Sequence, residues 1–423
     1  MINKFKPISI SLSPNVQKDD VALALKLLFQ PWRWIARHNT APGSRSAVQE
    51  LENNFRDYLG VKHAISFNSG RSSLFAILKN LNFKTGHEIL LQAFTCNAVP
   101  NPILWAGLNP IYVDCGDDFN IDIESLKKTI KEHNPRAIII QHTFGLPANL
   151  DEIISIAREN YMIVIEDCAH ALGAKYKDKY VGTLGDVAFF SFARDKVISC
   201  VYGGMVVTSD DVLAENLRKA QSDFGQPSLF WIRQQIFHPV LLHYIILPLY
   251  HFFDLGKIFL VFSQWSHMLS KAVHWKEKRG ERPDYFPKAL PNALALMAQN
   301  QFNKLEKFNA HRKEIAEFYY KELAGTSFVL PRKENNIFLR FAITHPKAHE
   351  IIYEAWNKHN ILIGDWYTSV IAPIDTQLDK MAYKQGSCPN AENIAQKTLN
   401  LPTHINISLK DAQRIVDFLK KYR

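Results

Sequence analysis

The chain has 423 residues, of which 47% are hydrophobic and 22% charged, values typical of a globular protein with a core and long enough for two domains. Its formal net charge of +9 suits anionic ligands, but no recognisable nucleic-acid-binding module accompanies it, so nucleic acid is not an expected partner. The five cysteines are scattered and form no metal-binding pattern, so we expect free thiols in a reducing cytoplasm and no metal site. Residues 1–14 lack the continuous apolar core of a secretory signal.

Short apolar runs alternate with helical patterns through the first half of the chain. The runs predict strands at 63–67, 88–92, 110–113, 137–141, 162–166, 187–192 and 204–208. Helical spacing predicts helices at 47–59, 71–81, 123–133 and 150–160. This alternation is typical of an α/β fold, in which helices cover both faces of a mostly parallel sheet.

The last third of the chain has a different pattern. Residues 289–323 read as one long helical stretch, with a break expected near Asn309. A strand at 338–343, a helix at 349–360, a strand at 361–364 and a helix at 408–421 should follow. We therefore expect a large domain over 1–225, an insertion over 226–288 and a smaller C-terminal α+β domain over 289–423.

The segment from Phe230 to Trp275 fits neither pattern. Residues 240–262 are dense in large apolar side chains, but Pro248, Asp254 and Gly256 interrupt them, which disfavours a membrane-spanning helix. Two interpretations stay open, a hydrophobic arm in a dimer interface or a hairpin on a membrane surface. Residues 226–290 contain eight basic and four acidic residues, which favours peripheral contact of 240–262 with anionic lipid.

The chemistry-bearing residues follow the expected strands. Asp167 ends one apolar run, and Lys196 comes shortly after another. A carboxylate and a lysine in this arrangement can hold pyridoxal phosphate, since the amine forms a Schiff base and the carboxylate keeps the pyridine nitrogen protonated. Residues 68–74 open a helix after a strand, where free amides and hydroxyls can bind a phosphate, and Ser191 adds another hydroxyl.

Each of these residues alone has a commoner structural explanation. Asp167 could cap a helix, His142 and His170 could be core histidines, Lys196 could be a surface lysine, and residues 68–74 could form a plain helix cap. The combination is far less likely by chance, because phosphate cradle, pyridine anchor and amine occur in chain order at strand ends of one sheet.

Over residues 42–419 the chain resembles the DegT/DnrJ/EryC1/StrS family of pyridoxal-phosphate-dependent sugar aminotransferases. The resemblance rests on segments 69–74, 93–95, 107–114, 142–148, 166–173, 182–186, 191–196, 203–204 and 400–404. It implies the aspartate aminotransferase-like (type I) fold, with a seven-stranded sheet in the large domain, and a homodimer, since family sites are built from two subunits. A lysine at position 196 is typical of the transaminases, whereas the dehydratase branch has a histidine there.

The resemblance also implies a role for each site residue. Lys196 would be the Schiff-base lysine and proton shuttle, Asp167 the partner of the pyridine nitrogen, and His170 a neighbour of the ring hydroxyl. The phosphate would be held by Gly70, Arg71, Ser72 and Ser191. Two cofactor-binding positions depart from the family pattern: Cys96 replaces a bulky residue, and Lys288 replaces an arginine that reaches the neighbouring subunit's site.

These features predict amino transfer from an amino acid, with glutamate as the favoured donor, to a keto-sugar in surface polysaccharide or related glycan biosynthesis. The acceptor is expected in nucleotide-linked or lipid-linked form, although Phe286 and the absence of a histidine in 361–367 depart from the family's usual substrate-binding elements. A deoxygenase or dehydratase with the same cofactor, and a catalytically inactive membrane-associated regulatory relative, remain alternatives. The expected location is the cytoplasm, including the inner face of the membrane.

Overall fold

The computed structural model describes residues 7–35, 46–250 and 255–422. A seven-stranded sheet lies at its centre, and all strands except β11 run parallel to one another. Across the sheet the order is β2 (His63–Phe67), β11 (Gly204–Thr208), β10 (Val187–Ser191), β7 (Ile163–Asp167), β6 (Ala137–Gln141), β3 (Glu88–Gln92) and β5 (Asn109–Val113). Every predicted strand of the large domain is present, so the expected α/β fold with a mostly parallel seven-stranded sheet is confirmed.

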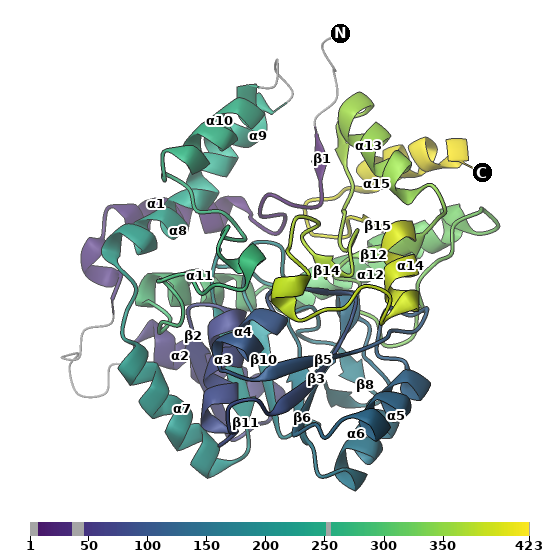
Figure 1. Ribbon diagram of the computed structural model, residues 1–423. Coiled ribbons are helices and arrows are strands. Elements are labelled where there is room, and N and C mark those ends of the chain that lie inside the picture. The colour runs from purple at the N-terminus through teal and green to yellow at the C-terminus, as the bar shows by residue number, and fades with distance from the viewer. Residues whose placement is uncertain (1–6, 36–45, 251–254, 423) are drawn as a thin grey trace.

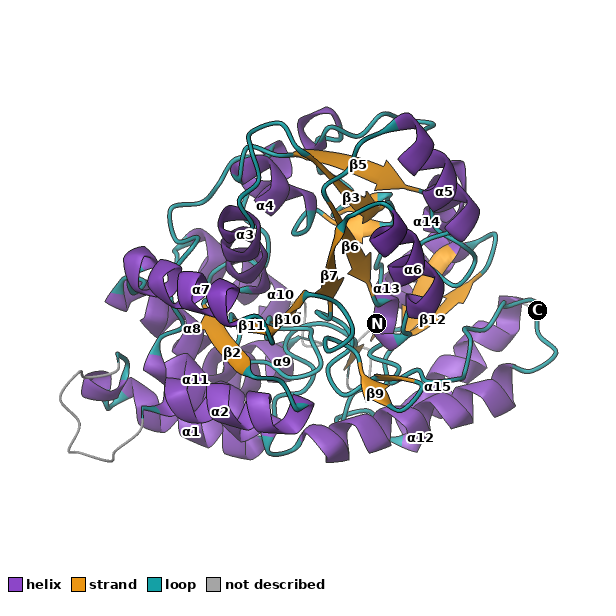
Figure 2. Cartoon of the chain, turned by 90° about the horizontal axis from the view of Figure 1, so that it is seen from below, coloured by secondary structure: helices purple, strands orange, loops and turns teal. Residues whose placement is uncertain are grey.

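Helices cover both faces of this sheet (Figure 2). On one side lie α3 (Gly70–Asn80), α4 (Pro100–Trp105) and α7 (Asp211–Phe224), and on the other α2 (Ala47–Leu59), α5 (Ile123–Glu132) and α6 (Leu150–Glu159). Strand β6 shows why two cores form, because Ile138 and Ile140 pack into one and Ile139 packs into the other. Alternation along a strand sends successive side chains to opposite faces, and both faces are covered here.

The C-terminal part packs against the large sheet's loops. Its strands β12 (Phe341–Thr344) and β15 (Thr398–Leu401) pair antiparallel, and α13 (Ala348–Lys358), α14 (Pro389–Lys397) and α15 (Leu409–Leu419) belong to the same part. Strand β4 (Thr95–Cys96) pairs with β14 (Ile371–Ala372) and so ties the loop after β3 to the smaller part.

The connecting helix differs from its prediction. It is divided into α11 (Asn292–Phe302) and α12 (Leu305–Leu323), so the break lies at residues 303–304 and not near Asn309. Asn309 is instead a buried helical residue whose Nδ2 donates to the carbonyl of Leu172 at 3.1 Å. The polar residue that suggested a break therefore makes a tertiary contact.

The N-terminal segment also takes a position that no sequence pattern indicates. Strand β1 (Ile8–Ser9) pairs parallel with β13 (Ile361–Leu362), which places the start of the described chain beside the C-terminal part. A two-residue strand is too short to show periodicity, so the sequence alone could not reveal this pairing. The domain bounds 1–225, 226–288 and 289–423 remain predictions.

The insertion forms an arm of consecutive helices (Figure 1). Helix α8 (Leu229–Leu241) packs against α1 (Lys18–Leu28) and continues through a π-helical turn (Leu242–Ile246) into α9 (Leu247–Leu249). Helix α10 (Leu255–Trp265) then lies beside α9 at the upper left of Figure 1. Residues 251–254 of the predicted contact segment fall outside the described residues. None of the described helices combines the length and the apolar character that crossing a bilayer requires.

One glycine fixes the sheet against the start of α3. A Cβ on Gly204 would lie 2.5 Å from the carbonyl carbon of Ser69, a backbone atom that cannot move away without shifting α3. We expect Gly204→Ala to lower the free energy of unfolding by about 3 kcal/mol through overpacking. Chemical denaturation would measure the loss. Gly116→Ala is the control, because its nearest neighbour would be Asp118 Oδ1 at an ordinary 3.4 Å; equal stability of the two variants would contradict the packing argument.

Candidate active site

A cavity of about 270 Å³ opens where β7, β10 and the start of α3 meet. Because the carboxyl ends of neighbouring parallel strands lie at one edge of a sheet, residues that follow β7 and β10 converge there. Seven of the predicted site residues line this cavity: Gly70, Arg71, Cys96, Asp167, His170, Ser191 and Lys196. The structure therefore brings the predicted phosphate cradle, acid and amine into one space.

Lys196 lies in the loop after β10 and is held by the N-terminal segment. Asn15 Nδ2 donates to the carbonyl oxygens of Lys196 at 2.7 Å and Val197 at 3.2 Å. Burial lowers the pKa of the Lys196 amine to about 8, although Cys96 and Asp167 act in the opposite direction. A substantial fraction of this amine is therefore uncharged near neutral pH, which a nucleophile or base requires.

Asp167 ends β7 with its carboxylate buried. Oδ1 accepts a hydrogen bond from the backbone N–H of Ala169 at 2.9 Å. Burial raises the pKa of this carboxyl, while that hydrogen bond and the charge of Lys196 lower it. A buried carboxylate is stable when it faces a positive partner, and a protonated ring nitrogen is such a partner.

His170 completes this side of the cavity. Its Nδ1 accepts from the backbone N–H of Phe144 at 3.3 Å, which leaves Nε2 as the donor. Burial, followed by the charges of Lys196 and Arg340, holds the pKa of His170 well below its usual range, so the ring stays neutral. It stacks on Trp366 with a centroid separation of 5.5 Å.

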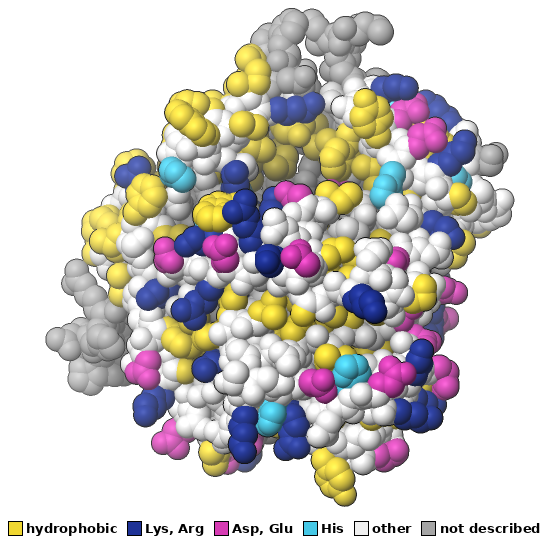
Figure 3. All heavy atoms as spheres, viewed as in Figure 1, with side chains coloured by type: hydrophobic (Ala, Val, Ile, Leu, Met, Phe, Trp, Pro, Cys, Tyr) yellow, Lys and Arg dark blue, Asp and Glu magenta, His cyan; other side chains and the backbone are white. Residues whose placement is uncertain are grey.

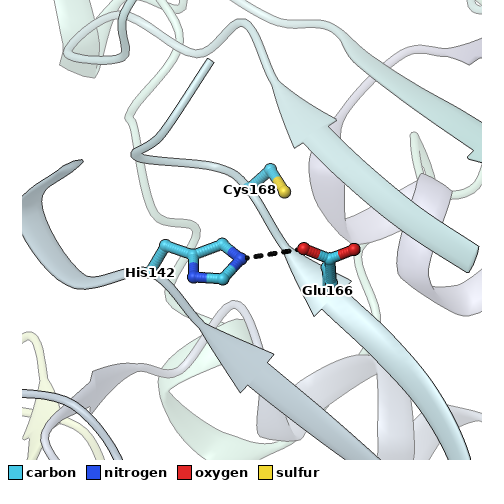
Figure 4. Close-up of side chains that lie close together, drawn as sticks. All are labelled: His142, Glu166 and Cys168. Carbon is cyan, nitrogen blue, oxygen red and sulfur yellow. Dashed lines mark hydrogen bonds and ion pairs between the residues drawn. The ribbon is translucent and has the colours of Figure 1, made fainter. Parts of the chain in front are cut away.

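Glu166, one residue before Asp167, points to the other face of the sheet and anchors the end of β7 (Figure 4). Its carboxylate accepts from the backbone N–H groups of Gly182, Leu184 and Gly185 at 2.7–2.8 Å and from His142 Nε2 at 3.2 Å. Burial opposes the charge, but His142 and the backbone donors lower the pKa of Glu166 below its ordinary value.

His142, Glu166 and Cys168 lie close enough to be considered as metal ligands. Both nitrogens of His142 are engaged, because Nδ1 accepts from the backbone N–H of Ala148 at 3.2 Å and Nε2 faces Glu166. The carboxylate of Glu166 is likewise occupied by its hydrogen bonds. His142 and Glu166 therefore form a structural hydrogen-bond network that supports β7, and Cys168 packs beside them in the hydrophobic core.

The start of α3 forms an anion-binding cradle. Ser69 caps the helix, with its Oγ accepting from the backbone N–H of Ser72 at 3.0 Å, and Gly70 begins the first turn. A Cβ on Gly70 would lie only 3.0 Å from Cβ of Ser191, so the glycine lets α3 approach the end of β10 closely. Amides of a first helical turn beside a serine hydroxyl suit a phosphate group.

Two predicted cofactor-binding residues do not line the cavity. Ser72 Oγ donates to Asn68 Oδ1 at 2.7 Å. Lys288 Nζ donates to the carbonyl of Phe224 at 2.8 Å. A role for Lys288 therefore requires the neighbouring subunit's cavity, as the family resemblance implies, and both assignments stay predictions.

The insertion supplies an unpredicted wall of the cavity. Ala272 and Val273 line it, and the guanidinium of Arg71 donates to the buried carboxylate of Glu277 and to the carbonyl of Ala272. Arg194 Nη2 donates to the carbonyl and hydroxyl oxygens of Ser270, both at 2.7 Å. Arg71, expected on a phosphate, is thus held by the insertion at the edge of the cavity.

Two charged residues near Lys196 also escaped the sequence interpretation. The guanidinium of Arg340 lies 3.5 Å from the ring centroid of Trp366, and its Nη2 lies 3.9 Å from Oδ2 of Asp195. Trp366 in turn lies under Lys196, whose Nζ is 4.9 Å from the ring centroid. The arginine within the apolar run 338–343 was the one feature of the sequence that could have indicated a buried charge at this site.

These residues fit pyridoxal phosphate. The cavity has an anion cradle at one end, a buried carboxylate and a neutral histidine, and a lysine with a lowered pKa. Cys96, whose thiol pKa is raised by burial, lies at the edge, where it offers a small apolar contact.

Comparisons with known proteins agree with this arrangement. Residues 29–231 and 271–420 match the model of the DegT/DnrJ/EryC1/StrS aminotransferase family. GDP-perosamine synthase from Caulobacter vibrioides is 38% identical over 182 residues, covering 43% of this chain and 49% of the relative.

Two solved structures share the fold. PseC from Helicobacter pylori, an aminotransferase involved in pseudoaminic acid biosynthesis, has a TM-score of 0.74 at 21% identity and covers 98% of this chain and 99% of its own. The PLP form of a putative sugar aminotransferase from Streptococcus pneumoniae has a TM-score of 0.73 at 19% identity, covering 99% and 97%. The predicted aspartate aminotransferase-like fold is thereby confirmed.

The lowered pKa of Lys196 predicts how cofactor uptake depends on pH. Only the uncharged amine attacks an aldehyde, so the uptake rate of the protein freed of cofactor should rise about fifty-fold from pH 6 to 8 and then level off. The growth of visible absorbance after addition of pyridoxal phosphate measures this rate. If the uptake rate instead reached half its maximum near pH 10.5, the pKa of an ordinary lysine, the buried environment assigned to Lys196 would be contradicted.

The network around Glu166 predicts a stability effect. In Glu166→Gln the amide NH₂ must face an N–H donor whichever way it is turned, so we expect a loss of about 3 kcal/mol in unfolding free energy at pH 7. In the folded protein the pKa of Glu166 lies below its ordinary value of 4.5. The extra stability of the wild type over Glu166→Gln should therefore be complete above about pH 4.5, and it should be lost as the pH falls through the pKa of Glu166 in the folded protein.

Chemical denaturation between pH 3 and 7 would measure this difference. Glu124→Gln, on an exposed side chain of α5, is the matched control and should change little. A Glu166→Gln protein as stable as this control would refute the anchoring role.

Proposed function

Because this chain belongs to the DegT/DnrJ/EryC1/StrS aminotransferase family, we propose that it moves an amino group from glutamate to the carbonyl carbon of a keto-sugar. GDP-perosamine synthase and PseC, which is involved in pseudoaminic acid biosynthesis, are named for sugar chemistry of this kind. They support a role in surface polysaccharide or related glycan biosynthesis, with the keto-sugar on a nucleotide or lipid carrier.

The proposed cofactor is pyridoxal phosphate, which the S. pneumoniae relative contains in one of its forms. When bound, it supplies an electron sink for the carbon that gains or loses the amine. Asp167 would pair with the ring nitrogen, and the neutral His170 would donate from Nε2 towards the ring hydroxyl. The start of α3 and Ser191 would hold the phosphate.

Lys196 carries the chemistry. Its buried amine, with a pKa lowered to about 8, would hold the cofactor as a Schiff base, with loss of water from its aldehyde, and once released from it would take up and return the proton at the reacting carbon. The cavity is lined largely by apolar surface, and Asp167 and Lys196 are buried in it, so their charges act at lower dielectric than in water.

The observation that carries the proposal is that Asp167 and Lys196 line one buried cavity together with the anion cradle. The same cavity could serve a deoxygenase, but a lysine at position 196 favours amino transfer. An inactive regulatory relative has no need for a buried lysine of lowered pKa, so catalysis is the better explanation.

The proposed assembly is a homodimer in which Lys288 faces the neighbouring subunit's cavity. A point charge there would add to the phosphate site in place of an arginine. Within its own subunit, the backbone of Lys288 is fixed by Asn68, whose side chain also bonds the carbonyl of Tyr285.

Lys196→Ala tests the function. We expect the variant to lose at least a thousandfold in turnover, because both cofactor attachment and proton transfer depend on this amine. The assay follows 2-oxoglutarate formed from glutamate with keto-sugars offered free, nucleotide-linked and lipid-linked. Mass analysis of the sugar product separates amino transfer from loss of water.

Lys313→Ala, at a lysine of α12 outside the cavity, is the control and should keep full activity. Purified wild-type protein should absorb in the near-visible range. A colourless protein that takes up no added pyridoxal phosphate would refute the cofactor, and an active Lys196→Ala would refute the lysine's role.

A further inference from the structure

Helix α10 has apolar residues on two sides: Phe259 and Leu260 pack towards the protein together with Gly256 and Ser263, and other large apolar residues point outward. Gly256 and Ser263 are its buried residues, and a Cβ on Gly256 would come within 2.3 Å of the carbonyl oxygen of Ile246. Ile258, Val261 and Trp265 are by contrast 61%, 66% and 75% exposed. The helix therefore exposes a second apolar face, whereas an ordinary amphipathic helix on a globular protein turns its apolar stripe to the core and a polar face to solvent.

Further exposed apolar side chains lie on α10 and on the segments next to it. Leu255 and Phe262 of α10 are also exposed, as are Tyr244 and Trp275 on the neighbouring segments. Figure 3 shows hydrophobic side chains gathered over the upper left of the molecule, where α10 lies in the matching view of Figure 1. A patch of this kind marks a docking surface.

The charges near this surface are mostly basic. Residues 226–276 contain one acidic residue, Asp254, against the basic residues Arg233, Lys257, Lys271 and Lys276, of which Lys276 lies 3.7 Å from Asp284. Exposed tryptophan and tyrosine beside basic residues are typical of the interface between water and lipid headgroups. A partner with anionic headgroups above an apolar layer matches both properties.

The family comparison argues against a second copy of the chain as the occupant. The match to the family model stops at residue 231 and resumes at 271, so α10 lies in a segment outside the shared architecture. A dimer contact common to the family would use segments that the family model covers. The insertion therefore adds a contact of a different kind.

We propose that α10, with the flanking basic residues, binds the surface of an anionic phospholipid bilayer. The helix has only 11 residues and lies along the bilayer surface. Its apolar face is buried at the boundary between the lipid headgroups and the acyl chains. The next residues, 270–277, hold Arg194 and Arg71 at the cavity, so docking keeps the active site beside the membrane. The proposal goes beyond the reaction and does not depend on it.

Vesicle flotation tests the proposal with the full chain. Wild-type protein should float with vesicles containing phosphatidylglycerol and phosphatidylcholine, and the double variant Ile258→Glu/Val261→Glu should partition at least tenfold more weakly. Both positions are exposed, so the fold should persist. Val212→Glu is the matched control, since Val212 in α7 is a 69% exposed helical valine outside the arm, and it should float like wild type.

Two further measurements separate the electrostatic from the apolar contribution to vesicle binding. Lys271→Gln and Lys276→Gln should each weaken partitioning about fivefold at low salt, because each lysine near an anionic surface contributes one charge. Brominated phospholipid should quench the fluorescence of the wild type more than that of Trp265→Phe, because only an inserted ring contacts the acyl region.

Wild-type protein that fails to float would overturn the proposal. So would a double variant that floats normally. If the double variant instead dissociates an oligomer in sedimentation while vesicle binding is unchanged, the face is a contact between copies and the proposal is wrong. Transaminase activity on nucleotide-linked sugars without vesicles should be unchanged in the Ile258→Glu/Val261→Glu variant, whose positions lie outside the cavity.

Discussion

The end of strand β7 is the constraint on which the site depends. Two consecutive carboxylates lie there, and alternation along the strand sends Glu166 to one side and Asp167 to the other. Glu166 is saturated by three backbone N–H groups and His142, so its buried charge is stabilised and the loop 182–185 is drawn against the strand. Asp167 is consequently held in a fixed direction, facing the cavity with one oxygen bound to Ala169.

The same edge of the sheet fixes Lys196. Strand β10 pairs with β7 so that Phe189 lies beside Asp167, and the loop after β10 brings the lysine back over the strand ends. Asn15 holds the carbonyl of Lys196 from the N-terminal segment, and the buried Arg312 of α12 donates to the carbonyl of Val197 at 2.8 Å. The loop backbone that carries the Lys196 amine is thus held in place both by the N-terminal segment and by α12.

Much of the sheet, and of the site at its edge, could be predicted from the sequence, because the patterns that indicate them are local. Seven apolar runs of strand length, with Asp167 and Lys196 at the ends of two of them, indicate a parallel sheet and its ligand-binding edge. The wall formed by residues 270–277 and the position of Arg340 could not be predicted, because they depend on contacts between segments far apart in the chain. Arg71 illustrates the limit: an acidic residue 206 positions later engages its guanidinium, a contact that the local motif could not indicate.

The insertion shows a second limit of sequence patterns. Composition revealed that 240–262 is apolar and basic at its flanks, but composition cannot say which side of a helix faces the protein. The packing decides this: Gly256 lies against the turn before α9, an approach that only a residue without a side chain allows, and Ile258, Val261 and Trp265 are left exposed. Because α8 packs on α1 and residues 270–277 are bound to Arg71 and Arg194, the arm is fixed to the body at both ends. Any surface that α10 contacts is therefore held in a defined orientation to the cavity.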